Sequence, residues 1–278
     1  MRNLLIIAHL TIHEAMRRRV LTAALIVGAA FLALFGVGLH FVVRELGHSH
    51  TMTIIERRVT LNALTLAGLF AASRLIVITA VLLPVDTLSG EIASGVIQTL
   101  AAKPIRRGEI VLGKWLGHGL VMAGYFLLVV GGVLLVARAI GHFSPPNIAP
   151  GLALLLLEAT VMLSVAIAGG TRLSTITNGM MAFGLYGFAF IGNWIEQIGT
   201  FADNVTARNV GTLSSLVLPT ESLWNLACYQ MQPSIMRELS FTPFSPVSVP
   251  SGAMIWWAVG YVLVALFLGL RAFRHRPL

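Results

Sequence analysis

Charged residues are scarce in this sequence. Asp, Glu, Lys and Arg make up 11% of its 278 residues, whereas hydrophobic residues make up 56%. A soluble domain has about 25% charged residues, and a soluble protein this apolar would expose large patches and aggregate. The composition therefore favours a membrane protein that crosses the bilayer several times over a soluble helical protein with a large core.

Cysteine and nucleotide-binding motifs are also nearly or wholly missing. Cys228 is the only cysteine, which excludes an intrachain disulfide. There is no zinc-finger spacing, Walker A loop or G-x-S-x-G motif, so no motif in the sequence predicts nucleotide binding by this chain. The net charge of +8 does not point to nucleic acid, because the basic residues flank apolar runs and serve as topology signals.

Six apolar runs approach the roughly 20 residues that a helix needs to cross about 30 Å of hydrocarbon. The first run is too long for a signal peptide and shows no clear cleavage site, so we expect it to remain as a helix. The sequence predicts a single-domain all-α membrane protein with six transmembrane helices, at 20–43, 61–85, 116–137, 149–169, 179–198 and 253–270.

The linkers between these runs differ in basic charge. Twelve of the 19 Lys and Arg residues fall in the N-terminal segment, 86–114, 171–178 and the tail, and six fall in the other linkers. The first set is therefore predicted to be cytoplasmic. Both termini then lie inside, as an even number of spans requires, and we expect a multi-pass protein of a prokaryotic cytoplasmic membrane.

The N-terminal segment 1–19 has the pattern of an amphipathic helix in the cytoplasmic interface of the lipid bilayer. Its polar and apolar residues project onto opposite halves of a helix, with Arg2, Asn3, His9, His13, Glu14 and Arg17 on one and Leu4, Leu5, Ala8, Ile12, Ala15 and Met16 on the other. The alternative is a plain extension of the first span.

The outer-side loop 199–251 is rich in proline and contains "PTESLWNLACYQM". Proline followed by Thr, Glu and Ser is typical of a helix start. Trp224 and Tyr229 suit a membrane–water boundary. We therefore predict one short helix that lies on, or dips into, the outer leaflet.

The loop 86–114 concentrates charge between two apolar runs. "EIASGVIQTLAA" has helical spacing of its apolar residues, and Lys103 and Pro104 end the pattern. A short helix with charges at both ends predicts a docking element for a cytoplasmic partner. The alternative is a solvated loop that obeys the positive-inside rule.

A family resemblance favours docking. Glu91-x-x-x-Gly95, Pro104-x-x-Arg107 and "EIVLGK" ending in Lys114 resemble the signature loop of type-2 ABC exporter permeases. "HEAMRRRVL" is similar to that family's elbow helix, and "SSLVLPTESLWNLA" to an outer segment of some members. Val96 departs from the Ser or Thr that often follows the glycine.

The resemblance implies a mechanism and a set of partners. The loop would form a coupling helix that sits in a groove of an ABC ATP-binding subunit, with Glu91, Gly95, Pro104, Arg107 and Lys114 as coupling residues. Two ATP-binding subunits, which bind ATP and Mg, would serve two paired permeases, a homodimer or a pair with a homologous permease. Hydrolysis would take place in these partners, so the resemblance implies no catalytic residue, bound metal or cofactor in this chain. The alternative is a protein that works without an ATP-binding partner. It would be a secondary transporter or channel, or a membrane anchor or assembly factor.

Two further sets of residues call for interpretation. His48, His50 and Met52 in the first outer loop are of the types that bind copper, and a copper-processing branch of the family exists. Their loose spacing equally fits an ordinary polar loop.

Arg74 and Glu158 fall inside the second and fourth runs, at depths that differ by about 6 Å. A charge at mid-membrane normally faces a partner or water, so we predict an ion pair or a shared water-filled pocket. The alternative is that Arg74 reaches the outer interface and Glu158 lines the transport path alone.

Overall fold

The computed structural model describes residues 2–48, 53–93, 106–234, 246 and 248–275, and every regular element in these ranges is an α-helix. The predicted all-α class is therefore confirmed for these residues. The helices are α1 (Arg2–Arg17), α2 (Arg19–His48), α3 (Ile54–Leu82), α4 (Thr87–Ala93), α6 (Arg107–Gly141), α7 (Ile148–Gly170), α8 (Thr175–Phe201), α9 (Val205–Val217), α10 (Thr220–Gln230) and α12 (Ala253–Arg274).

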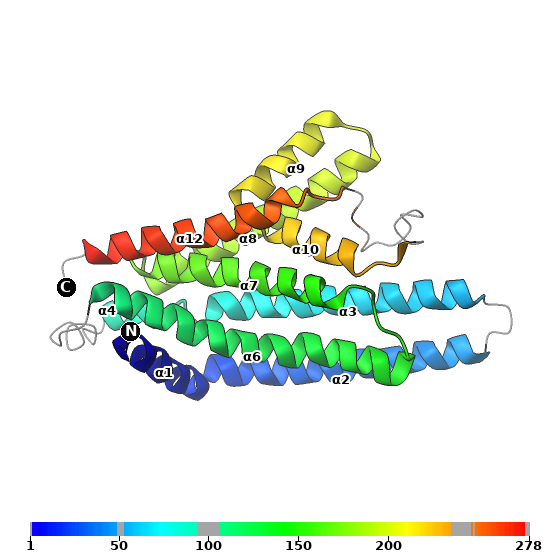
Figure 1. Ribbon diagram of the computed structural model, residues 1–278, viewed down its shortest axis with the longest axis horizontal. Helices are drawn as coiled ribbons and strands as arrows, with labels where there is room; N and C mark the ends of the chain where they lie inside the picture. Colours follow the sequence, from blue (N-terminus) through cyan, green and yellow to red (C-terminus); the bar gives the residue numbers. More distant parts are fainter. Residues whose placement is uncertain (1, 49–52, 94–105, 235–245, 247, 276–278) are drawn as a thin grey trace.

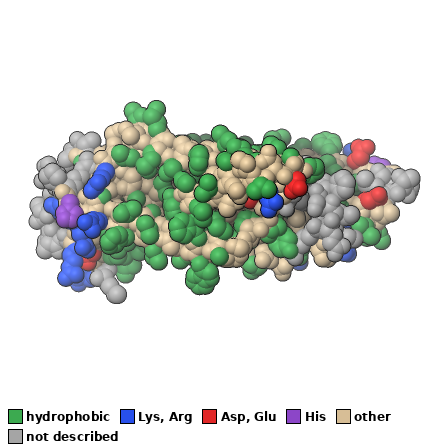
Figure 2. All heavy atoms as spheres, turned by 90° about the horizontal axis from the view of Figure 1, so that it is seen from above, with side chains coloured by type: hydrophobic (Ala, Val, Ile, Leu, Met, Phe, Trp, Pro, Cys, Tyr) green, Lys and Arg blue, Asp and Glu red, His purple; other side chains and the backbone are tan. Residues whose placement is uncertain are grey.

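The long helices lie side by side along one axis, and both termini are at the same end of the bundle (Figure 1). We call this the terminal end, defined by α1, α4 and the last turn of α12. Hydrophobic side chains cover the middle of the visible face, and Lys and Arg side chains gather at the terminal end (Figure 2). This distribution is typical of a bundle whose middle lies in hydrocarbon.

Five of the described helices are long and apolar enough to cross a membrane: α2, α3 with its continuation to Ile92, α6, α7 and α12. The α3 helix begins earlier than the predicted span 61–85, at a capping box. Thr53 Oγ1 accepts from the Glu56 backbone N–H, and the Glu56 carboxylate accepts from the Thr53 N–H. These two bonds satisfy donors that the first helical turn leaves free.

The predicted fifth span, 179–198, corresponds to α8, which has 27 residues but is not among these five helices. Several glycines and the polar residues Asn193, Glu196 and Gln197 lower its hydropathy. Its second half pairs with α9 in a hairpin that leans away from the bundle (Figure 1). The count of six spans therefore stays a prediction.

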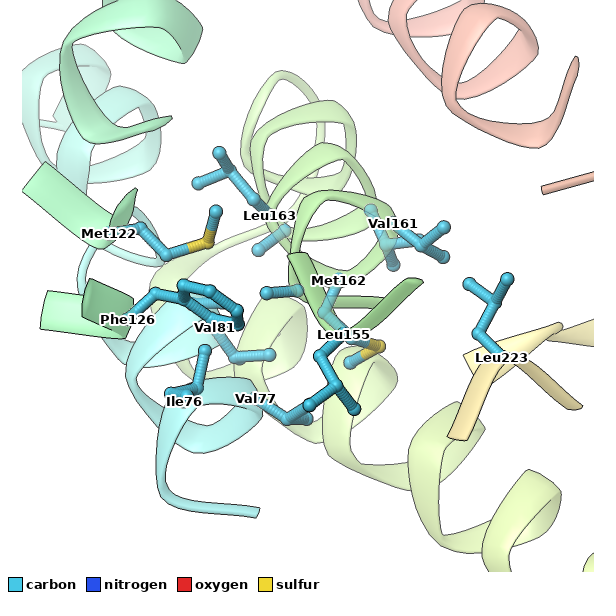
Figure 3. Close-up of a cluster of buried hydrophobic side chains, with 14 of the residues drawn as sticks. Ile76, Val77, Val81, Met122, Phe126, Leu155, Val161, Met162, Leu163 and Leu223 are labelled. Carbon is cyan, nitrogen blue, oxygen red and sulfur yellow. The ribbon is translucent and has the colours of Figure 1, made fainter. Parts of the chain in front are cut away.

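The core is built around α7. In the most apolar 18-residue stretch of α7, 67% of the residues are buried, whereas the corresponding stretch of α2 has 11% buried residues. Side chains from α3, α6 and α7 interlock there, and Leu223 of α10 lies beside Val161 of α7 (Figure 3). The α2 helix leaves large apolar residues such as Ile26, Leu34 and Phe41 exposed, a surface suited to lipid or to another membrane helix.

In the described part of the segment predicted as an outer-side loop, which leaves out 235–245 and 247, there are two helices, α9 and α10, where we expected one. The start of α9 is marked by Asn204, whose side chain accepts from the Ala207 N–H. We expected α10 to lie on, or dip into, the outer leaflet. The structure buries it among other helices instead of leaving it on the surface of the fold, and its depth in the membrane stays a prediction. All residues from Thr220 to Cys228 are buried, and Trp224 is 3% exposed. The helix packs against α7 and α8 inside the fold.

The predicted apolar face of the N-terminal helix is only partly right. Ala8 and Ala15 are buried as expected, but Ile7 and Thr11 complete the buried face, whereas Leu5 and Met16 are exposed. The α1 helix breaks from α2 at Arg18 and packs along α6, so it is not a plain extension of the first span (Figure 1).

Candidate functional site

A charged cluster lies inside the bundle where α3, α7, α8 and α10 meet. Arg74 of α3 donates through Nη1 to the carboxylate of Glu221 and to the hydroxyl oxygen of Tyr186. Its Nη2 lies 3.4 Å from Oε1 of Glu158. The side chains of both glutamates are 1% exposed and that of Arg74 is 15% exposed, so these charges are held away from the surface of the fold.

Aromatic rings surround the guanidinium of Arg74. Its Cζ atom lies 4.7 Å from the centroid of Phe70, 5.5 Å from that of Tyr186 and 5.8 Å from that of Trp224. A planar, weakly hydrated guanidinium is attracted to such ring faces. The rings thus stabilise the cation where water is excluded.

The carboxylates outnumber the cation. Both oxygens of Glu158 and Oε2 of Glu221 are buried and accept no hydrogen bond from any residue that the structure describes, and Arg74 Nη2 donates none. Leaving buried charged groups partly unpaired is costly, particularly at membrane depth. The cluster is therefore polar and incompletely satisfied, which is typical of a site with a functional purpose rather than of an ordinary core.

The structure brings Arg74 and Glu158 into contact, as the spacing of the two runs predicts. The sequence did not predict the third member of the cluster, Glu221, which lies beside them. Glu221 was missed because α10 was expected to lie on, or dip into, the outer leaflet. Its only local signal was the acidic residue in the first turn of the helix, which is equally typical of surface helices.

A second polar network lies at the terminal end and centres on Lys114. Its Nζ lies 2.5 Å from Oε1 of Glu91, the residue as a whole is 3% exposed, and the Glu91 side chain is 17% exposed. The resemblance implied a coupling role for Glu91, which stays a prediction, but its side chain is mostly buried rather than open to solvent. The α4 helix is turned so that Glu91 faces α6 and neutralises a buried ammonium group.

His118 lies one turn further along α6 and contacts the start of α4. Its Nδ1 lies 2.9 Å from the Lys114 carbonyl oxygen, and its Nε2 lies 3.1 Å from Thr87 Oγ1. A carbonyl oxygen can only accept, so Nδ1 carries the proton and Nε2 accepts from the Thr87 hydroxyl.

The same network reaches α1 and α8. The Arg18 guanidinium contacts Glu14 at 2.5 Å and Asp86 at 3.7 Å. Burial alone would raise the pKa of Glu14, but the hydrogen bond from Arg18 and the charges of Lys114 and Arg18 outweigh it and hold that pKa below its ordinary value. Thr175 of α8 donates to Asp86 at 2.9 Å.

Two glycines of α6 let α1 approach closely. A Cβ atom at Gly113 would lie 2.7 Å from Cγ2 of Ile7, and one at Gly117 would lie 2.8 Å from the backbone oxygen of Ala8. Real Cβ atoms do not approach backbone oxygens this closely, so α1 can lie here only because the side chains are missing.

The other predicted site residues are scattered. Arg107 begins α6 and donates to the Arg274 carbonyl oxygen at 3.1 Å, next to the end of α12. His48 ends α2. Gly95, Pro104, His50 and Met52 lie outside the described residues. Within the described ranges no three His, Cys, Asp or Glu residues are grouped as metal ligands.

Comparison with known proteins decides the family. Residues 4–278 match the model of the ABC-2 family transporter proteins. The chain belongs to the ABC-2 transporter family. This ABC-2 protein is also similar to the probable ABC transporter permease protein NosY of Pseudomonas aeruginosa, with 28% identity over 225 residues, or 74% of the chain and 78% of the relative. The protein of the same name from Stutzerimonas stutzeri is 42% identical over 60 residues, 21% of the chain and 22% of the relative.

Family membership and the five apolar helices together make this ABC-2 protein an integral membrane permease, the transport subunit of an ABC transporter. The resemblance stated from the Glu91–Lys114 motif is confirmed. Membership implies an ABC ATP-binding partner in general terms.

Proposed function

We propose that this permease is the membrane-spanning subunit of an ATP-driven exporter in a prokaryotic cytoplasmic membrane, with both termini inside. A separate ATP-binding subunit binds ATP and Mg and hydrolyses the nucleotide. Two permeases pair, either two copies of this chain or one copy and a homologue, and each docks one ATP-binding subunit through the loop 86–114. In this proposal α8 is the fifth of six spans and α1 lies in the cytoplasmic interface.

One observation carries the docking proposal: the loop between α3 and α6 starts with Asp86 and α4, and this segment contacts α6, α8 and the residue that follows α1. The Glu91–Lys114 pair ties α4 to α6, Asp86 accepts from Thr175 of α8, and Asp86 also faces Arg18 at the end of α1. A solvated loop would not need such contacts. A helix that a partner displaces needs them, because its movement reaches the membrane spans only through side chains that are packed or bonded to them.

The Arg74 cluster supports a path through the bundle. It lies among α3, α7, α8 and α10, and intramembrane charges of this kind are associated with substrate or ion pathways. ATP-driven rearrangement would shift α10 against α3 and α7 and so change access at this depth.

Co-expression with a cognate ABC ATP-binding subunit tests the proposal. The expected result is a complex that survives purification and hydrolyses ATP in lipid nanodiscs at a rate that depends on the permease. A Walker A lysine variant of the ATP-binding subunit is the control for contaminating ATPases. A permease that forms no complex, yet transports a solute down an ion gradient by itself, would indicate a secondary transporter or channel instead. A chain with neither activity that holds another complex together would indicate an anchor.

A further inference from the structure

Two side chains of α4 bind two side chains of α6, and the two residues of each pair of neighbours along a helix are four positions apart. Thr87 and Glu91 are four residues apart on α4, and Lys114 and His118 are four residues apart on α6. Residues at this spacing lie on one face of a helix, one turn apart. The contacts Thr87–His118, at 3.1 Å, and Glu91–Lys114, at 2.5 Å, therefore join two successive turns of one helix to two of the other.

We propose that these four residues form a two-point clamp that makes α4 and α6 move as one body during coupling. A single contact would let α4 pivot, whereas two contacts one turn apart fix both its position and its rotation. The inference rests on the proposed function, because it assigns the route by which a push on the loop 86–114 enters the membrane. Thr87 and His118 act as positioning residues and do not touch the ATP-binding subunit.

Burial makes the clamp firm. Thr87 is fully buried, His118 is 1% exposed and Lys114 is 3% exposed. Water cannot readily replace partners at such sites, and an unpaired donor or acceptor there is costly. Lys114 is thus committed to α4 and is not offered to a partner protein.

The other side of the α4 segment is tied to α8. The hydroxyls of Ser89 and Thr175 lie 2.8 Å apart, and Thr175 also donates to Asp86 at 2.9 Å. One turn later, Asn178 donates to the Val85 carbonyl oxygen at 3.3 Å. A displacement of α4 by the ATP-binding subunit is therefore transmitted to α6 through the clamp and to α8 through Thr175. Both helices respond to the same movement of α4.

Exchange of the charged pair distinguishes a clamp from a docking contact. Glu91→Lys, Lys114→Glu and the double exchange are each reconstituted in nanodiscs with the wild-type ATP-binding subunit. Either single variant should lower permease-dependent ATP hydrolysis about fivefold or more, the lower end of coupling between distant sites. The double exchange should return at least half of the activity, because the pair forms again with reversed polarity.

The second point of the clamp is tested by Thr87→Val, which keeps the shape and removes the hydroxyl. Its matched control is Thr65→Val, since Thr65 is equally buried but donates only within its own helix, to the Leu61 carbonyl oxygen. Thr87→Val should lower permease-dependent hydrolysis about fivefold while the complex still assembles, and the control should not.

Two results would overturn the clamp. The double exchange could stay as inactive as Glu91→Lys alone, in which case Glu91 contacts the partner directly. Thr87→Val could match Thr65→Val, in which case α4 needs no second attachment. Failure of the proposed function is a different result: the wild-type permease then forms no complex and stimulates no hydrolysis.

Discussion

The guanidinium of Arg74 donates a hydrogen bond to the carboxylate of Glu221, which lies 147 residues later in the chain. This contact explains why α10 is inside the bundle although the sequence around it looks like a surface helix. Arg74 joins α3 to α7 through Glu158, to α8 through Tyr186 and to α10 through Glu221. It is the centre of a junction of four helices.

Removal of Arg74 should therefore be severe. Arg74→Gln leaves two buried carboxylates without a cation, and breaking a buried pair in this way costs about 3–5 kcal/mol. We expect a large drop in the thermal midpoint of the detergent-solubilised permease, or loss of folded protein. Arg57→Gln, at an exposed position of the same helix, is the control and should leave the midpoint unchanged. Equal midpoints for both variants would show that the cluster contributes nothing to stability.

The two glutamates should not be equivalent. Glu221 accepts a hydrogen bond from Arg74, whereas Glu158 accepts none from the described residues. Glu158→Gln leaves one cation and one carboxylate, so its effect on the midpoint should be small. Glu221→Gln removes the charge-assisted bond, which is worth about 1.5–3 kcal/mol, and should lower the midpoint clearly. The reverse order would mean that Glu158 is the principal partner of Arg74.

Exchange of Arg74 and Glu158 tests their proximity directly. Arg74→Glu places three carboxylates together and Glu158→Arg places two cations beside Glu221, so each should impair assembly or transport. The double variant restores one cation to two carboxylates and should recover part of the loss. A double-mutant cycle quantifies this recovery, and defects that simply add would remove the pairing.

Local patterns in the sequence account for most of the helices. Apolar length predicts α2, α3, α6, α7 and α12, and "PTESLWNLACYQM" predicts α10, because these signals act over a few turns. The burial of α10 was not predictable, since it depends on Arg74 in a distant helix. The burial of Lys114 was not predictable for a similar reason: a lysine at the start of a span usually marks topology, and only packing shows that its side chain is enclosed.

The close contact of α1 with α6 makes a prediction about two glycines on one helix. Gly117→Ala places a methyl group 2.8 Å from the Ala8 carbonyl oxygen, which should displace α1 and cost about 1–3 kcal/mol. Gly124→Ala is the matched control, because no described atom lies within 4 Å of a Cβ there. Alanine has the higher helix propensity, by up to about 1 kcal/mol, so the control should be neutral or stabilising. Thermal midpoints and proteolysis of the N-terminal segment measure both; a stable Gly117→Ala variant with a protected α1 would contradict the close packing.

Glu91 and Arg107 both belong to the proposed coupling loop, yet truncation should affect them differently. The family resemblance implies a coupling role for both residues. Glu91→Ala should also disturb the fold, because it leaves the buried Lys114 ammonium without its carboxylate. Such a loss costs about 3–5 kcal/mol when one partner of a buried pair is removed.

Arg107→Ala removes the hydrogen bond to the Arg274 carbonyl oxygen, which lies at an exposed position. Exposed contacts of this kind contribute about 0–1 kcal/mol, so the fold should keep its thermal midpoint. The permease with Arg107→Ala should nevertheless bind the ATP-binding subunit more weakly, measured by co-purification at equal expression. Glu91→Ala combined with Lys114→Met, which removes the stranded charge, should regain the midpoint lost by Glu91→Ala. Failure of Lys114→Met to restore it would show that Glu91 stabilises the fold by some contact other than this pair.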